Sequence, residues 1–324
     1  MAFSLPDHWV WDFWFADDGD LYHLYYLHAP KSLGHESLRH RNARVGHATS
    51  ADLVSWENLG EVLVPGAPGD FDESATWTGS VIQGPDGLWW MFYTGTRFLS
   101  ESAHANVETI GAATSTDLHT WTKLPGPLLR ADPTWYETLG NSEWPEESWR
   151  DPWVFADEDG NGWHMLITAR ANHGAVDDRG VIGHATSKDL LHWAAQPPLS
   201  APGSGFGHLE VPQMCTIDGE TILLFSCDTA KLSEESRQAG NRGGIWCLAP
   251  QSSGGPYDAE HAALLETEEL YSGRAVQDRS GEWVVLAFLN TSSDGTFGGA
   301  VSDPLRYDWK TRERVQLESE GAPA

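Results

Sequence analysis

Basic residues are scarce in this chain, which has 20 lysines and arginines against 47 aspartates and glutamates. The formal net charge is −27 at pH 7. A negative field of this size repels phosphate backbones and anionic lipid surfaces. Nucleic acid and membrane partners are therefore not expected, whereas a neutral substrate such as a sugar is compatible with the charge.

Cysteine and long apolar runs are also rare. The three cysteines, Cys215, Cys227 and Cys247, cannot form a disulfide framework and have no metal-binding spacing. No run approaches the length of a membrane span, and the first residues lack the basic and apolar regions of a secretion signal. We therefore expect a cytoplasmic protein with no metal and no other cofactor.

No segment shows a sustained amphipathic helical period, and an internal repeat dominates the sequence instead. The signature Gly-x-Ala-Thr-Ser-x-Asp-Leu occurs at Gly46, Gly111 and Gly183, and degenerate copies occur at Gly244 and over residues 298–305. A turn glycine between two apolar runs precedes each copy, and these glycines are Gly19, Gly87, Gly160, Gly219 and Gly281. Repeats of this length indicate stacked or radial units of about four strands each.

The apolar runs inside each unit predict β-strands. Residues 21–26, 88–93 and 283–288 are aromatic or β-branched and too short for helices. Asp-Gly between such runs is a strong hairpin signal. The sequence thus predicts an all-β, five-bladed β-propeller of four-stranded antiparallel blades. We expect one domain over residues 1–317 and a short disordered tail at 318–324. A β-sandwich is the alternative, but it does not require a signature at fixed phase.

Acidic residues recur at one phase of this repeat. Four residues precede a signature glycine by 34, 34, 32 and 34 positions, and these are Asp12, Trp77, Asp151 and Glu210. Acids at the start of inner strands would face a central cavity together. Each acid alone also has a structural interpretation. Asp12 could be a turn residue, Asp151 could form a buried ion pair with Arg150, and Glu210 could be a surface glutamate. Uncompensated burial of charge costs several kcal/mol, so such a cluster is seldom kept for stability.

The sequence neighbours of these acids predict different proton affinities. Asp12 lies among tryptophans, and Asp151 follows Arg150, which would keep it ionised. Glu210 has apolar neighbours that would raise its pKa and let it hold a proton near neutrality. One neutral acid beside charged ones is what glycosidic cleavage requires.

These motifs resemble those of glycoside hydrolase families 32 and 68, the five-bladed β-propeller fructosidases and fructosyltransferases. The resemblance rests on residues 10–14, 77–80, 92–95, 150–152 and 210–212, in the same order over residues 9–310. Family 43 is a more distant likeness. The segment around Asp12 is closer to the family 68 form, and Val211 stands where family 32 commonly has a cysteine.

The resemblance implies a role for each of these side chains. Asp12 would be the nucleophile, Asp151 the transition-state stabiliser and Glu210 the general acid/base. The implied substrate-binding residues are Arg150, which would hold sugar hydroxyls together with Asp151, Trp11 and Trp77 at the pocket floor, Thr78 beside the nucleophile, and Ser80.

Several functions are compatible with this pattern. The leading hypothesis is a retaining β-fructofuranosidase acting on sucrose or fructo-oligosaccharides, with transfer to another sugar as a variant. An inverting arabinofuranosidase or xylosidase would instead use Asp12 as the base. A non-catalytic sugar-binding propeller is a third possibility. A phosphate-dependent lyase would need an anion pocket, and no cluster of arginine and lysine in the sequence predicts one.

Overall fold

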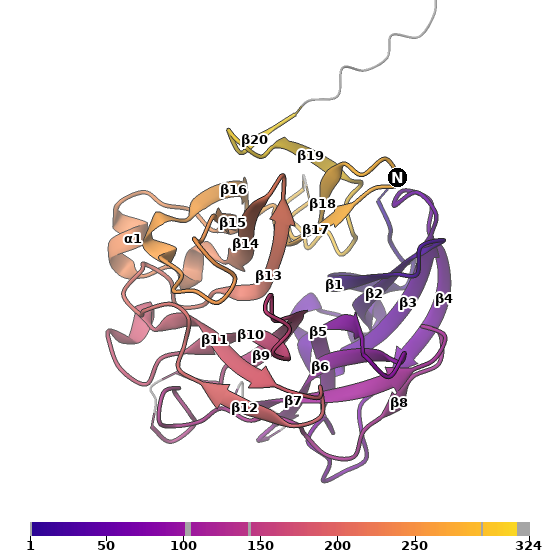
Figure 1. Cartoon of the computed structure of the whole chain (residues 1–324), viewed down its shortest axis with the longest axis horizontal. Coiled ribbons are helices and arrows are strands. Elements are labelled where there is room, and N and C mark those ends of the chain that lie inside the picture. Colours follow the sequence, from indigo (N-terminus) through magenta and orange to yellow (C-terminus); the bar gives the residue numbers. More distant parts are fainter. Residues whose placement is uncertain (1, 101–104, 142–143, 293, 316–324) are drawn as a thin grey trace, which may run out of the picture.

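Five four-stranded antiparallel sheets are arranged around a central axis (Figure 1). The computed structural model describes residues 2–100, 105–141, 144–292 and 294–315, so the expected tail at 318–324 lies outside the described residues. In every sheet the four strands follow one another in chain order. The predicted all-β, five-bladed propeller is therefore confirmed.

The blades differ mainly in the length of their fourth strand. The first two blades contain β1 (His8–Asp17), β2 (Tyr22–Pro30), β3 (Arg44–Ser50), β4 (Glu57–Leu63), β5 (Ala75–Gln83), β6 (Trp89–Phe98), β7 (Asn106–Ser115) and β8 (Thr122–Lys123). The next two contain β9 (Trp149–Ala156), β10 (Trp163–Arg170), β11 (Gly180–Ser187), β12 (Trp193–Gln196), β13 (Glu210–Ile217), β14 (Glu220–Cys227), β15 (Gly244–Leu248) and β16 (Ala263–Thr267). The fifth contains β17 (Leu270–Gln277), β18 (Trp283–Leu289), β19 (Leu305–Asp308) and β20 (Glu313–Arg314).

Helical segments in the described residues are short. Six are 3₁₀ turns, η1 (Lys31–Leu33), η2 (Glu36–Leu38), η3 (His40–Asn42), η4 (Val176–Asp178), η5 (Thr229–Lys231) and η6 (Ala259–His261). One is α-helical, α1 (Glu234–Gln238). Among the described residues, no helix has the length and apolar character needed to cross a membrane.

The signature glycines lie on the third strands, where they make room for aromatic rings. A Cβ atom at Gly46 would lie 2.3 Å from the ring of Tyr26, and one at Gly111 would lie 2.3 Å from Phe71. The copy at residues 298–305 departs from the others, because Val301 pairs singly with Phe288 before β19 begins. The third strand of the fifth blade is therefore interrupted.

Each of the five inner strands, β1, β5, β9, β13 and β17, carries an irregularity in its pairing with the second strand. Asp151, Val211 and Ser272 lie at these irregularities with positive φ values of 58°, 52° and 50°. Such a bulge bends the strand and turns neighbouring side chains toward one side. The acids do not occupy identical positions, because Glu210 precedes its bulge whereas Asp12 and Asp151 lie within theirs.

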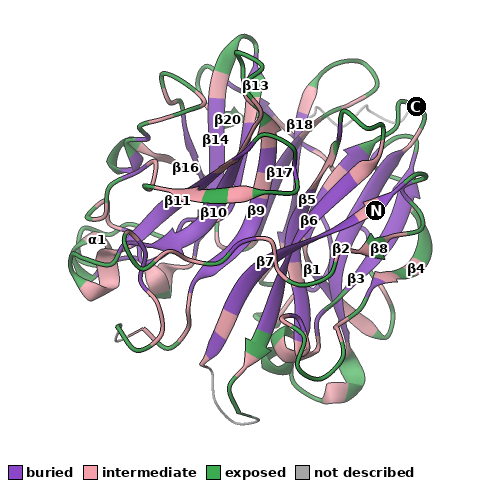
Figure 2. Ribbon diagram, turned by 60° about the horizontal axis from the view of Figure 1, so that its bottom comes forward, coloured by how far each residue is buried: buried purple, intermediate pink, exposed green. Residues whose placement is uncertain are grey.

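Buried residues follow the strands of every blade, and exposed residues gather at the loops (Figure 2). Trp11, Trp14 and Trp149 are among the largest fully buried side chains. The ring is closed where the first residues meet the fifth blade, because Phe3 and Val301 exchange two backbone hydrogen bonds of 2.8 Å. The inner strand of the first blade thus packs against that of the fifth.

Candidate active site

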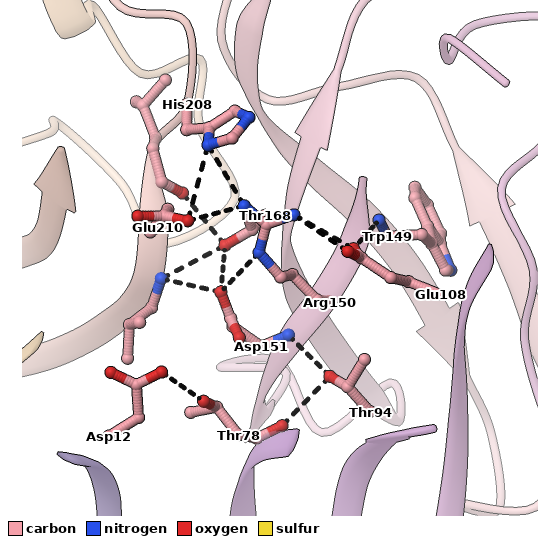
Figure 3. Close-up of polar contacts among 12 residues, drawn as sticks. Asp12, Thr78, Thr94, Glu108, Trp149, Arg150, Asp151, Thr168, His208 and Glu210 are labelled. Carbon is pink, nitrogen blue, oxygen red and sulfur yellow. Dashed lines mark hydrogen bonds and ion pairs between the residues drawn. The ribbon is translucent and has the colours of Figure 1, made fainter. Parts of the chain in front are cut away.

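A cavity of about 520 Å³ is lined by residues from the inner strands of all five blades. Asp12, Asp151 and Glu210 all line it, so the structure brings together the three acids singled out from the sequence. Figure 3 shows Asp151 between the other two. Residues almost 200 positions apart in the chain thus face one cavity, because successive blades place their bulges around the same axis.

Asp12 accepts a hydrogen bond at each carboxylate oxygen. Thr78 donates to Oδ2 at 2.9 Å, and Ser272 donates to Oδ1 at 2.5 Å. Burial raises the pKa of Asp12, and these two hydrogen bonds oppose that rise because they stabilise the charged form. The carboxylate is fixed in orientation by hydroxyls from both neighbouring blades.

Asp151 is almost fully buried and held by its backbone and its side chain. Its N–H donates to Thr94 Oγ1 at 2.9 Å, and its Oδ2 accepts from Thr168 Oγ1 at 2.8 Å and from Val211 N at 3.2 Å. Burial raises the pKa of Asp151 to about 6, and Arg150 offsets only part of this effect. Arg150 thus favours the ionised form of Asp151 as expected, but the desolvation of the carboxylate is the larger influence on its pKa.

Glu210 is bound on both oxygens. Arg150 Nη2 donates to Oε1 at 2.6 Å, and the hydroxyl of Tyr271 donates to Oε2 at 2.5 Å. Burial by itself would raise the pKa of Glu210, but Arg150, His208 and Tyr271 together hold it well below its usual range. The expected raised pKa of Glu210 is therefore wrong, because its neighbours in space are polar although its neighbours in sequence are apolar.

Arg150 links the site to buried acids behind it. Besides Glu210, its guanidinium contacts Glu108 at 3.0 Å and Glu146 at 3.5 Å. Glu108 is fully buried and also accepts a hydrogen bond from the N–H of Trp149 at 2.9 Å. Arg150 lines the cavity as predicted, but most of its guanidinium N–H groups are directed at these carboxylates.

The other sequence-predicted residues divide between the cavity and the blade interior. Trp11, Trp77 and Thr78 line the cavity, and Trp77 donates its indole N–H to the backbone oxygen of His40 at 2.8 Å. Ser80 is buried away from the residues that line the cavity, and its hydroxyl accepts a hydrogen bond from the N–H of Val154 at 3.1 Å. We therefore place Ser80 in the contact between two blades and not in substrate binding.

Tyr271 and Ser272 are functional candidates that the sequence reasoning missed. Both lie on the inner strand of the fifth blade, which carries no acid at its bulge. A regular spacing could have found Ser272, because it precedes the turn glycine Gly281 by nine residues, as Asp151 precedes Gly160. The search for acids and tryptophans passed over this hydroxyl.

A further missed acid, Asp228, lines the cavity near Glu210. Burial raises the pKa of Asp228 to about 7, and the charges of Glu210 and Glu268 add to the rise. Within this pair, Asp228 therefore binds a proton more tightly than Glu210, whose pKa is lowered.

Cations also gather at the cavity, which corrects the expectation that no basic cluster exists. Arg39, Arg41 and Lys231 line it together with Arg150. Each of the first three lies over an aromatic ring: Arg39 is 4.1 Å from the centroid of Phe297, Arg41 is 4.0 Å from that of Phe98 and Lys231 is 4.6 Å from that of Trp144. Cation–π contacts of this kind hold charged groups in place. Residues 37–41 of the loop after β2 supply much of this wall.

Metal ligands are a separate question. Within the described ranges, no group of three or more His, Cys, Asp or Glu side chains has the arrangement of a metal site.

Relatives of this chain are found among curated proteins. The curated relatives include sucrose-6-phosphate hydrolase of Pediococcus pentosaceus, which is 31% identical over 180 residues, 55% of this chain and 32% of that protein. β-Fructofuranosidase 1 of Zea mays is 28% identical over 208 residues, 63% of this chain and 28% of that protein. The matched segments thus span about a third of the length of these relatives.

Solved structures share the fold. Inulosucrase from Halalkalicoccus jeotgali, bound to kestose, superposes with a TM-score of 0.79 at 22% identity, over 100% of this chain and 94% of that one. The catalytic domain of Microbacterium saccharophilum β-fructofuranosidase gives a TM-score of 0.74 at 18% identity, over 94% of this chain and 79% of that one.

Residues 13–309 match the glycosyl hydrolases family 32 N-terminal domain. This match covers most of the chain and includes the segments that carry Asp151 and Glu210. The chain therefore belongs to glycosyl hydrolase family 32.

Proposed function

We propose that this protein is a retaining β-fructofuranosidase that hydrolyses short fructosides such as sucrose or fructo-oligosaccharides. The observation that carries the proposal is the convergence of Asp12, Asp151 and Glu210 in one cavity. A double displacement needs one acid to attack and one to exchange a proton, and Asp12 and Glu210 both line the cavity. The third is placed to interact with sugar hydroxyls.

In the proposed reaction, Asp12 attacks the anomeric carbon of the fructosyl unit while Glu210 protonates the departing glycosidic oxygen. Water activated by Glu210 then hydrolyses the covalent fructosyl–enzyme, and the configuration is retained. Asp151 stabilises the oxocarbenium-like transition state through its charge and its contacts to the sugar. The hydroxyls of Thr78 and Ser272 orient Asp12 for attack.

Glu210 must hold a proton for the first step, although Arg150, His208 and Tyr271 hold its pKa well below its usual range. A bound sugar displaces water from around Glu210, and this desolvation favours the neutral carboxyl. We therefore expect binding of a fructoside to raise the pKa of Glu210. Carbon-13 NMR titration of the Glu210 carboxyl, with and without fructose, measures the change directly. An unchanged pKa would contradict this part of the mechanism.

A substrate panel tests the proposal as a whole. Purified protein is incubated with sucrose, inulin, levan and nitrophenyl pentofuranosides, and the anomer of the first product is read by NMR within minutes. Release of β-fructofuranose first supports retention. First release of the inverted anomer, or cleavage of pentofuranosides alone, favours an inverting arabinofuranosidase or xylosidase. Binding without cleavage of any member favours a sugar-binding propeller.

A second candidate substrate is a fructoside that carries a phosphate, and the cations at the cavity favour it. Arg39, Arg41 and Lys231 line this cavity in a chain with 20 basic residues in total. A curated relative is named sucrose-6-phosphate hydrolase. The ratio of kcat/KM for sucrose 6-phosphate and sucrose decides between the two. If the phosphate is recognised, Lys231→Met lowers this ratio about tenfold or more. A ratio below one in the wild type rejects this candidate.

A further inference from the structure

Two adjacent hydroxyls of the fifth blade each contact a different acid of the cavity. Tyr271 donates to Glu210 Oε2 at 2.5 Å, and Ser272 donates to Asp12 Oδ1 at 2.5 Å. Both side chains are buried, and Ser272 is fully so. The blade that lacks an acid at its bulge therefore touches the two acids between which proton and sugar transfer would take place.

The backbone of β17 explains how neighbours in sequence reach the same cavity. In a regular strand, consecutive side chains point to opposite faces. Here the pairing is irregular between Tyr271 and Arg274, and Ser272 has a φ of 50°. Positive φ is unfavourable for residues other than glycine and persists where the surroundings enforce it. The N–H of Ser272 is held by Ser226 Oγ at 3.0 Å, so the unusual conformation is anchored by the adjacent blade.

Each hydroxyl completes the contacts of a carboxylate. On Asp12, Ser272 binds one oxygen while Thr78 binds the other. On Glu210, Tyr271 binds one oxygen while Arg150 binds the other. Two donors on opposite oxygens fix the plane of a carboxylate, which a single donor leaves free to rotate.

We propose that Tyr271 and Ser272 are a pair of positioning residues, in which Tyr271 orients the general acid/base Glu210 and Ser272 orients the nucleophile Asp12. This inference rests on the function proposed above. The pair gives the fifth blade a role in the reaction although it contributes no catalytic acid.

The pair has a selective signature in pH dependence. A hydroxyl that donates to a carboxylate stabilises its charged form, so loss of the hydroxyl raises the pKa of its partner. Ser272→Ala raises the pKa of Asp12 by about one unit and leaves the pKa of Glu210 unchanged. Tyr271→Phe raises the pKa of Glu210 by about one unit and leaves the pKa of Asp12 unchanged. The two variants accordingly move different limbs of the pH profile of kcat/KM, each toward higher pH. Both lower kcat about tenfold and change KM by less than about twofold, because they orient acids and do not hold the sugar.

The experiment titrates the carboxyl groups of Asp12 and Glu210 by carbon-13 NMR in both variants, alongside the kinetic profiles. Tyr22→Phe is the matched control for Tyr271→Phe. The hydroxyl of Tyr22 donates to the backbone oxygen of Gln277, which lies on β17 as Tyr271 does but outside the cavity. Ser302→Ala is the matched control for serine, since Ser302 is buried in the same blade and accepts from the N–H of Ala287. Ser272→Gly removes the hydroxyl and suits the positive φ, so it serves if Ser272→Ala fails to fold.

The predicted result is one raised pKa per variant, on the contacted acid alone, and no shift in either control. Unchanged carboxyl pKa values in Ser272→Ala and Tyr271→Phe, or the same shift in the controls, would overturn the proposal. The NMR titration needs no turnover. A wild-type protein that cleaves no fructoside therefore rejects the proposed function, while the titration still decides whether the two hydroxyls hold the two acids.

Discussion

Asp12, Asp151 and Glu210 all line one cavity, yet their proton affinities differ. Burial raises the pKa of Asp12 and Asp151, whereas the guanidinium of Arg150 at 2.6 Å keeps that of Glu210 low. Desolvation acts on all three alike, so the contacts of each carboxylate decide the order. The division of roles among the acids therefore depends on one arginine and on four hydroxyls, those of Thr78, Ser272, Thr168 and Tyr271.

Removal of each acid tests this division. We expect Asp12→Asn, Asp151→Asn and Glu210→Gln each to lower kcat/KM at least about a thousandfold. Burial disfavours the charges of Asp12 and Asp151, so the melting temperature should stay the same or rise in those two variants. It should fall in Glu210→Gln, because Arg150 and Tyr271 stabilise the charged form of Glu210. Activity assays and thermal unfolding by circular dichroism measure the two effects. An Asp12→Asn protein with wild-type turnover would contradict the assignment.

Thr78 and Ser80 form a matched pair on β5. Thr78→Val removes a hydrogen bond to Asp12, and we expect kcat to fall about tenfold with little change in KM. Ser80→Ala removes a contact to the N–H of Val154, and we expect kcat and KM to stay near wild type while stability falls by about 1 kcal/mol. Kinetics and urea unfolding of both variants test the difference. A raised KM in Ser80→Ala would instead indicate that Ser80 takes part in substrate binding.

The strand pairing is conserved between blades more closely than the side chains at equivalent positions. In the first and third blades, a hydrogen-bonded chain of side chains runs Asp18–His23–His47 and Asp157–His164–His184, with His–His contacts of 2.9 Å in both. The second blade has Trp90 and Ala112 at the matching register positions. A large and a small residue thus replace two histidines, and the volume is conserved.

These histidines make the protein sensitive to acid. Burial lowers the pKa of His47 to about 3 and that of His184 to about 4. The unfolded chain binds protons below about pH 6.5 while the folded one does not, so the free energy of unfolding falls as the pH drops from about 6.5 toward 4. His184→Gln should reduce this slope by up to about 1.4 kcal/mol per pH unit. Urea unfolding at several pH values measures it, with exposed His192→Gln as the control. Equal slopes in His184→Gln and wild type would reject this explanation.

The sequence predicted the five blades and the meeting of the three acids because glycine signatures and turns mark the register of each blade. It did not reveal the bulges, which depend on pairing between strands, and so it missed Ser272 on a blade whose glycine copy is interrupted. The prediction of a raised pKa for Glu210 was wrong for a related reason. Leu209 and Val211 are its neighbours along the chain, but Arg150 reaches it from another blade, 60 residues away.

Charge is unevenly distributed over the molecule as a whole. The formal net charge is −27, while four of the basic residues line the single cavity that holds the acids. Repulsion among the surface carboxylates destabilises the folded state, and salt screens it, since the Debye length falls from about 10 Å at 0.1 M to about 3 Å at 1 M. The melting temperature should therefore rise by several degrees between low salt and about 1 M NaCl. Equal effects of NaCl and choline chloride are expected. A rise with one cation only would point to specific ion binding.

The hydrogen bond between Ser272 and Asp12 joins residues 260 positions apart, at the seam where the first inner strand meets the last blade. Four finished blades would already bury most of the tryptophans but would leave the nucleophile without one of its two partners. During refolding from urea, recovery of fructoside cleavage should consequently lag behind recovery of tryptophan fluorescence. Recovery of enzyme activity would then report the docking of the fifth blade onto the first. Substitutions near Phe3 or Val301 would abolish activity while most of the blades remain folded.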